Sequence, residues 1–106
     1  MEKFDSKQLE QVAMQLISKG GEARSLAMEA VFSAKEGDLE QADELLDRSE
    51  DALNAGHVKN AELLWAEANN TDIPLSILLI HSLDHIMNAQ TVVELAREIV
   101  DVYRTR

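Results

Sequence analysis

The sequence predicts an all-α fold of three long antiparallel helices that form an up-down-up bundle. Apolar and small residues recur close to the helical period of 3.6 through most of the 106-residue chain. Turn-forming residues interrupt this pattern twice, at Gly37 with Asp38 and at residues 69–74, and no strand pattern competes. Three segments of about 30 residues would each be about 45 Å long. Short connections between such segments favour antiparallel packing, within a single domain of residues 1–106.

The first helix is predicted from about Ser6 to Lys35. Asp5 and Gln8 have the spacing of a capping box at its start. Gly20 and Gly21 interrupt its middle, where they would kink the helix or let another backbone approach closely, and a break in the helix is the alternative. The face expected to pack carries Leu9, Val12, Leu16, Ala23, Ala27, Ala30, Val31 and Ala34.

The second helix is predicted from Asp38 to about Ala68. Gly37 suits the residue that follows a helix C-terminus, and Asp38 with Gln41 repeats the capping spacing. His57 lies beside the face that we expect to pack, and Trp65 is interpreted as a core or interface residue. That face carries Leu39, Ala42, Leu46, Ser49, Leu53, Gly56, Asn60 and Leu64.

The third helix is predicted to follow the turn formers at 69–72 and to end near Tyr103. Pro74 is expected in its first turn, where a missing N–H costs nothing. Around residues 75–87, apolar side chains cover nearly every direction, so this part of the helix should be buried all round. Two partner helices cannot easily cover it, and self-association is therefore expected. Met87, like Trp65, is interpreted as a core or interface residue. One strip holds Pro74, Ile77, His81, Asn88, Val92, Leu95, Ile99 and Tyr103, with Asp84 and His85 at its margins.

Composition excludes several classes of function. The chain has 20 acidic and 10 basic residues, a formal net charge of −10, which argues against nucleic acid and anionic membranes as partners. The absence of cysteine excludes disulfides, thiolate nucleophiles and zinc-thiolate sites. Charged residues occupy the N-terminus where a signal peptide needs an apolar core, so a cytoplasmic location is expected. Membrane insertion of residues 74–93 would be costly, because an aspartate and two histidines lie at their centre.

The segment HSLDHIM places His81, Asp84 and His85 within the most apolar part of the chain. An imidazole can carry a phosphoryl group transiently or ligate a metal, because one ring nitrogen offers a lone pair while the other is held by a hydrogen bond. For His57 and His85, a satisfied core histidine is the simpler interpretation. A buried Asp84 needs compensation, either from a residue of another helix such as Arg24 or from a metal ion.

Three segments together resemble a known family. They are residues 21–25 (GEARS), residues 34–39 (AKEGDL) with Ala42 after them, and residues 81–87 (HSLDHIM). In this order and spacing they are similar to the enzyme IIA component of the lactose/cellobiose/chitobiose class of the bacterial phosphoenolpyruvate:sugar phosphotransferase system. The resemblance extends from about Leu9 to Tyr103.

The resemblance implies an enzyme, a phosphotransferase, in which His81 accepts a phosphoryl group from the histidine-containing phosphocarrier protein. His81 would pass the group to a cysteine of enzyme IIB during uptake of a β-linked disaccharide of the lactose, cellobiose or chitobiose type. It also implies a homotrimer, in which Asp84 of each subunit meets around a divalent cation such as Mg²⁺ on the three-fold axis. His85, His57 and Asn60 are the candidate supporting residues.

Two positions depart from the family pattern: Leu83 and Asn60 stand where the family usually has glutamine, and both shorten or remove hydrogen-bonding reach. The alternative function is a non-enzymatic helical adaptor or metal-stabilised oligomer with structural histidines. A metal hydrolase would need three protein ligands with an open position, and no such set is evident within one chain.

Overall fold

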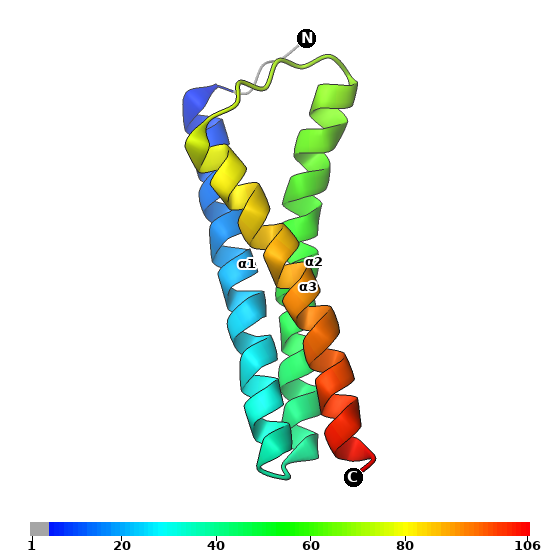
Figure 1. Cartoon of the computed structure of the whole chain (residues 1–106). Helices are drawn as coiled ribbons and strands as arrows, with labels where there is room; N and C mark the ends of the chain where they lie inside the picture. The colour runs from blue at the N-terminus through cyan, green and yellow to red at the C-terminus, as the bar shows by residue number, and fades with distance from the viewer. Residues whose placement is uncertain (1–4) are drawn as a thin grey trace.

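Three helices run antiparallel along the whole length of the molecule in a computed structural model that describes residues 5–106 (Figure 1). They are α1 (Ser6–Lys35), α2 (Leu39–Ala68) and α3 (Ile77–Arg104), in a bundle of 55 × 20 × 17 Å. Residues 5–106 contain no strand, and the predicted three-helix, up-down-up fold is confirmed. Residues 1–4, on which the argument about a signal peptide partly depends, lie outside the described residues.

Local hydrogen bonds begin α1 as predicted. The Asp5 carboxylate accepts the N–H of Gln8 at 2.7 Å, and the Gln8 side chain accepts the N–H of Asp5 at 3.0 Å, which completes a capping box. The helix then runs through Gly20 and Gly21 without interruption, so the alternative of a break there is wrong.

The turn between α1 and α2 also follows the prediction. Gly37 has φ of +88°, a left-handed conformation that glycine adopts without a steric penalty. The N–H of Gly37 donates to the Ala34 carbonyl at 3.0 Å, and that of Asp38 donates to the Ser33 carbonyl at 2.9 Å. The Asp38 carboxylate then accepts the N–H of Gln41 at 3.0 Å and caps α2.

The start of α3 differs from the prediction. Pro74 is not in the first turn: it lies in the extended connection, and α3 begins at Ile77 with Ser76 as its N-cap. The Ser76 hydroxyl accepts the N–H of Leu79 at 3.1 Å. The serine decides the boundary because its side chain accepts a hydrogen bond from an otherwise unpaired helix N–H. A proline in the first turn would only remove one such N–H and would supply no acceptor.

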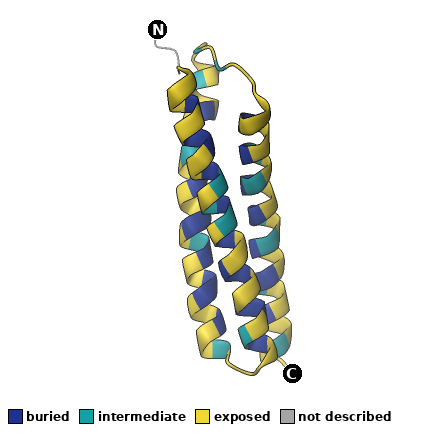
Figure 2. Cartoon of the chain, turned by 90° about the vertical axis from the view of Figure 1, so that its left-hand side faces the viewer, coloured by how far each residue is buried: buried dark blue, intermediate teal, exposed yellow. Residues whose placement is uncertain are grey.

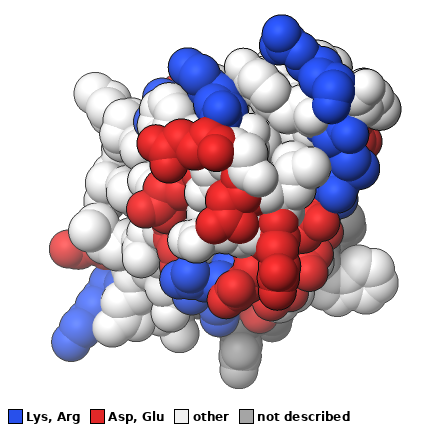
Figure 3. All heavy atoms as spheres, turned by 90° about the horizontal axis from the view of Figure 1, so that it is seen from below, with Lys and Arg blue, Asp and Glu red and all other residues white. Residues whose placement is uncertain are grey.

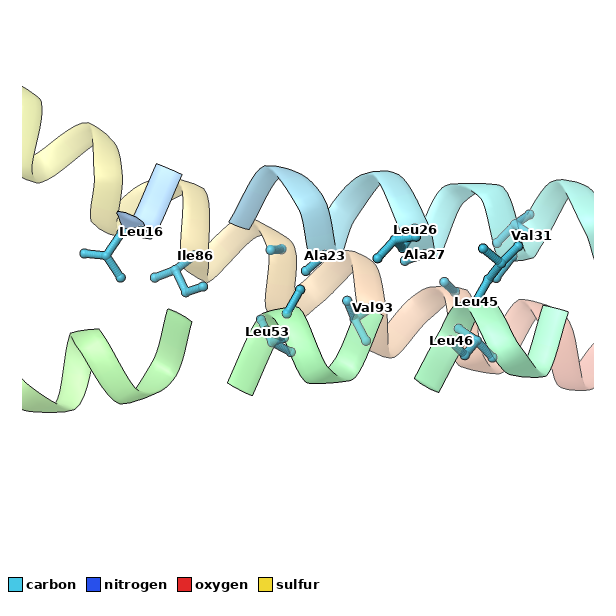
Figure 4. Close-up of a cluster of buried hydrophobic side chains, with 14 of the residues drawn as sticks. Leu16, Ala23, Leu26, Ala27, Val31, Leu45, Leu46, Leu53, Ile86 and Val93 are labelled. Atoms are coloured by element: carbon cyan, nitrogen blue, oxygen red, sulfur yellow. The ribbon is translucent and has the colours of Figure 1, made fainter. Parts of the chain in front are cut away.

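The core lies between the three helices, and the buried residues lie on the helix faces that are turned toward one another (Figure 2). The labelled residues of Figure 4 come from all three helices and point into the space between them. The largest fully buried apolar side chains are Leu16, Leu46, Ile86 and Val100. Alanines on the buried face of α1 let its neighbours approach closely. Ala23, Ala27, Ala30 and Ala34 were predicted to pack, and Ala13 is buried as well.

The packed face of α3 is not the strip through His81. The buried residues of α3 are Leu79, Ser82, Ile86, Ala89, Val93, Ala96 and Val100. By contrast, Ile77 is 88% exposed, and His81 and Leu95 are exposed as well. Small side chains at Ala89 and Ala96 explain the choice, because they let α3 lie close against the other helices. One chain therefore covers residues 75–87 on one side only, as the sequence led us to expect, and their burial by self-association stays a prediction.

The C-terminal part of α2 diverges from the other two helices (Figure 1). Leu63 is buried there, whereas Leu64, predicted to pack, is 62% exposed. Trp65 is 74% exposed and Met87 is 55% exposed, so neither fills the core of the chain. The helical period alone does not decide between these neighbouring leucines, and the side on which the rest of the bundle lies selects Leu63.

Ion pairs join α3 to α2 near the opposite end of the bundle. Arg97 contacts Glu50 and Arg104 contacts Asp43, each at 2.5 Å. The hydrogen bond to Asp43 raises the pKa of the Arg104 guanidinium above its ordinary value. Acidic side chains gather across the middle of this end of the molecule (Figure 3). Among residues 5–106, no helix is both long and apolar enough to cross a membrane.

Replacing the N-cap of α3 should weaken the beginning of the helix that carries HSLDHIM. Ser76→Ala leaves the N–H of Leu79 without its acceptor, and we expect the free energy of unfolding to fall by about 1 kcal/mol in urea titrations. Ser76→Asp restores an acceptor and should recover most of the loss. Equal stability of the two variants would contradict the assigned cap.

Candidate functional site

His81 and His85 lie one turn apart on α3, and their rings are in contact. The two Nε2 atoms are 3.0 Å apart, the ring centroids are 4.5 Å apart, and the ring planes are inclined by 79°. His81 is exposed and His85 is partly buried. A neutral imidazole has one N–H donor and one lone-pair acceptor, so one ring donates to the other across this contact. The i,i+4 spacing in the sequence is the signal that could have predicted the contact.

Two glycines position this part of α3. A Cβ atom on Gly20 of α1 would lie 3.0 Å from the carbonyl oxygen of His85 and 3.3 Å from the backbone nitrogen of Ile86. A Cβ atom on Gly56 of α2 would overlap Cδ1 of Ile86, which is fully buried. The backbone of α3 therefore lies directly against α1. This is the close approach of another backbone that was one of the two roles considered for Gly20 and Gly21. With Ile86 directed inward, His81 is held on the outer surface.

Asp84 is exposed, so its predicted burial is wrong for a single chain. Among residues 5–106 no cation forms an ion pair with it, and Arg24 is exposed and does not contact it. The described part of the chain also has no cluster of three or more His, Asp or Glu side chains that could hold a metal ion. A metal ion bound at Asp84 would therefore need ligands from more than one chain.

Exposed apolar side chains surround the histidine pair. Ile77, Ile80 and Met87 are all at least half exposed on the N-terminal half of α3. Leu75, just before the helix, is exposed as well. Contiguous apolar residues on a protein surface mark a site of interaction with another molecule. Residues 75–87 thus carry apolar side chains on nearly all sides of the helix, but the rest of the chain packs against only one of these sides.

His57 and Asn60 lie on α2 and are both partly buried. His57 lines a polar hollow between α2 and α3 whose other residues include Asn54, Gln90 and Glu94. Gln90 is nine residues beyond His81, or about 13 Å along the helix. The structure brings His85 to His81 but does not bring His57 into contact with that pair within one chain.

Leu83 is partly buried and packs against the core. It separates His81 from Asp84 in the sequence, and its side chain offers no hydrogen-bonding group. Among residues 5–106, the polar side chain in contact with His81 is the imidazole of His85.

Comparison with known proteins gives a consistent result. Residues 11–104 match the family described as the lactose/cellobiose-specific IIA subunit of the PTS system. The chain is 39% identical over 98 residues to the lichenan-specific phosphotransferase enzyme IIA component of Bacillus subtilis, covering 92% of this chain and 89% of that protein. It is 35% identical over 99 residues to the N,N'-diacetylchitobiose-specific EIIA component of Escherichia coli, covering 93% and 85%.

Solved structures agree with this comparison. A crystal structure of the cellobiose-specific enzyme IIA from Bacillus anthracis superposes with a TM-score of 0.89 at 42% identity, covering 95% of this chain and 91% of that one. The IIA(Chitobiose) chain in solution structures of its complex with HPr, from Escherichia coli, superposes with a TM-score of 0.79 at 35% identity. The match covers 92% of this chain and 94% of that chain.

Adding a methyl group at Gly20 should move the backbone beneath His85. In Gly20→Ala the new Cβ would press on the His85 carbonyl, and we expect a net loss of about 1–3 kcal/mol in the free energy of unfolding. Gly21→Ala is the matched control, because nothing lies within 4 Å of a Cβ there. The control should gain about 0.5–1 kcal/mol from higher helix propensity. Equal gains in both variants, measured by urea unfolding, would show that the close approach does not constrain α3.

Proposed function

The chain belongs to the lactose/cellobiose-specific IIA family of the phosphotransferase system, and from that premise we propose that His81 is the residue that carries the phosphoryl group. As a member of this lactose/cellobiose/chitobiose class, the protein is a phosphotransferase component. The observation that supports the choice of residue is the exposed ring of His81, held on the outer face of α3 with a second imidazole 3.0 Å from its Nε2 atom. His85 is partly buried and His57 lines a different hollow.

The chemistry of the transfer follows from this position. A lone pair on a neutral His81 nitrogen attacks the phosphorus of a phosphohistidine on the donor protein, in line with the nitrogen that leaves. Phosphoryl transfer depends mainly on positioning and charge stabilisation, so an accessible and oriented nucleophile is the central requirement. The rigid helix beneath His81 supplies the orientation, because Ile86 and the backbone of residue 85 are packed against two other helices.

We assign the donor as HPr, the histidine-containing phosphocarrier protein, and the acceptor as a cysteine of enzyme IIB. The complex of the similar IIA(Chitobiose) with HPr supports the first assignment. The relatives named for lichenan, chitobiose and lactose support uptake of a β-linked disaccharide or a related sugar. Such a carrier works in the cytoplasm and inserts no segment into the membrane.

We further propose that three copies of the chain associate through the apolar surface around His81. Ile77, Ile80 and Met87 are exposed in one chain, and sister copies would remove them from water. Asp84 lies within the same surface, so association would also bring carboxylates into an apolar setting where they repel one another. A hard divalent cation such as Mg²⁺, held by Asp84 of each subunit, would neutralise that charge with oxygen ligands.

Three residues are candidates for support of the phosphoryl group. His85 is in direct contact with His81. No hydrogen bond joins His57 or Asn60 to His81 among residues 5–106, so we assign any role of either residue to a neighbouring subunit. Asn60 is a shorter amide than the glutamine usual in the family, which limits its reach.

The competing function is a helical adaptor whose histidines only hold an oligomer together. It predicts the same fold and the same association but no covalent modification. Incubation with phosphoenolpyruvate and the general phosphotransferase proteins separates the two functions.

We expect such incubation to add one acid-labile phosphate per chain, detected by intact mass. His81→Ala should abolish the gain because it removes the nucleophile. His57→Ala keeps the nucleophile and should still reach one phosphate per chain. A phosphorylated His81→Ala protein would refute the assignment of the acceptor, and an unmodified wild-type protein would favour the adaptor.

Asp84→Leu should release the bound cation while the trimer persists. Removal of three like charges from a buried axis offsets the lost ion, so we expect the melting temperature to stay constant or rise. Light scattering reports the mass and elemental analysis the metal content. Glu98→Leu, which removes an exposed carboxylate from the same helix, should leave the metal content unchanged. A native protein that is monomeric and free of cations would contradict this part of the proposal.

A further inference from the structure

The contact between His81 and His85 fixes more than the positions of the two rings. Their Nε2 atoms are 3.0 Å apart, which is hydrogen-bonding distance. Within residues 5–106, neither ring forms a hydrogen bond to any other group. Whichever ring donates in this single bond therefore determines which nitrogen carries the proton in both rings.

Two directions of the bond are chemically distinct. If His85 donates its Nε2–H, His81 carries its proton on Nδ1 and presents its lone pair at Nε2, the nitrogen farthest from the backbone. If His81 donates instead, its only available lone pair lies on Nδ1, next to Cβ and the helix surface. The second direction places the nucleophile where a large partner protein meets the helix backbone. Only the first direction keeps an unprotonated nitrogen at the outer end of the His81 ring. Its lone pair accepts the N–H of His85 until the incoming phosphoryl group takes the place of that hydrogen bond.

We infer that His85 is a positioning residue for phosphoryl transfer: its Nε2–H donates to Nε2 of His81, selects the reactive tautomer, and then donates to an oxygen of the transferred phosphoryl group. This inference rests on the proposed function, in which His81 is the acceptor. It assigns His85 a directional hydrogen bond that a merely structural histidine would not need.

The transfer balances without a further reactant. The P–N bond of the donor phosphohistidine breaks, and its electron pair stays on the donor nitrogen. A new P–N bond forms with the Nε2 lone pair of His81, which carried no proton and loses none. His81 keeps its proton on Nδ1, and His85 keeps its own on Nε2. The N–H of His85 changes only its acceptor, from a ring nitrogen to a phosphoryl oxygen.

The packing around His85 suits a fixed donor. Its carbonyl group lies against Gly20, and the next residue, Ile86, is completely buried. The ring itself is partly buried, whereas that of His81 is exposed. The donor therefore stays anchored to the bundle while the acceptor faces the partner protein. The N–H must turn from the ring nitrogen to a phosphoryl oxygen during transfer, and an anchored ring keeps this movement small.

The test is long-range ¹H–¹⁵N NMR of the ring nitrogens in the full-length protein. It is recorded at about pH 8, where free imidazole is neutral. In the wild type we expect His81 in the Nδ1–H form and His85 in the Nε2–H form. His85→Phe keeps a ring of similar shape but no donor, and should return His81 to a mixture of tautomers. His85→Gln offers an amide donor and should restore part of the preference.

Kinetics supply a second readout. His85→Phe should accept the phosphoryl group roughly three- to tenfold more slowly, the factor that one net hydrogen bond provides, and His85→Gln should recover part of the loss. The melting temperature of each variant reports its folding. If His85→Phe fails to fold, the wild-type spectrum alone decides. A spectrum with the proton of His81 on Nε2 and that of His85 on Nδ1 would overturn the inference.

The outcomes separate this inference from the proposed function. A His81→Ala protein that still accepts phosphate would refute both the assignment of His81 as the acceptor and the role of His85. If phosphorylation is confined to His81 but the tautomer of His81 is unchanged in a folded His85→Phe protein, only the role of His85 would be overturned.

Discussion

The close packing of α3 between two glycines is the constraint on which the rest of the structure depends. Gly20 of α1 faces the backbone of His85, and Gly56 of α2 faces the side chain of Ile86. No larger residue fits at Gly20 unless the α3 backbone moves, and none fits at Gly56 unless Ile86 moves. The three helices meet at this level of the bundle, and the same turn of α3 carries the histidine pair. Fold and site are thus built on one set of contacts.

This arrangement explains how a reactive group can be held firmly and still be reached. Ile86 is directed into the core, so the residues on the opposite side of the same turn are directed outward. His81 gains an exposed position on a rigid helix, and His85 lies between the core and the surface. Precise placement of catalytic groups is achieved more reliably on packed helices than on loops. Under the proposed function the chain needs no cleft of its own, because the substrate would be a phosphoryl group carried by another protein.

The exposed apolar residues near His81 show that one chain does not complete its own surface. Ile77 and Ile80 would be costly to leave in water, and Asp84 lies on the same part of α3 without an ion pair to any cation among residues 5–106. A bundle of this size buries a limited core, and association is a common remedy. The proposed trimer links these facts, since the surface that stabilises the assembly would be the surface that frames the site.

The sequence by itself determined the features that arise from local interactions. The capping box at Asp5 and the turn at Gly37 involve residues within a few positions of each other, so their side chains fix the helix ends wherever the helices later pack. The HSLDHIM segment likewise identified the histidine pair and the family. Only the tertiary structure decided that Leu63 rather than Leu64 packs, that the His81 strip of α3 faces outward, and that Asp84 is exposed in one chain. Those outcomes depend on the direction from which another helix approaches, and helical periodicity alone does not contain that direction.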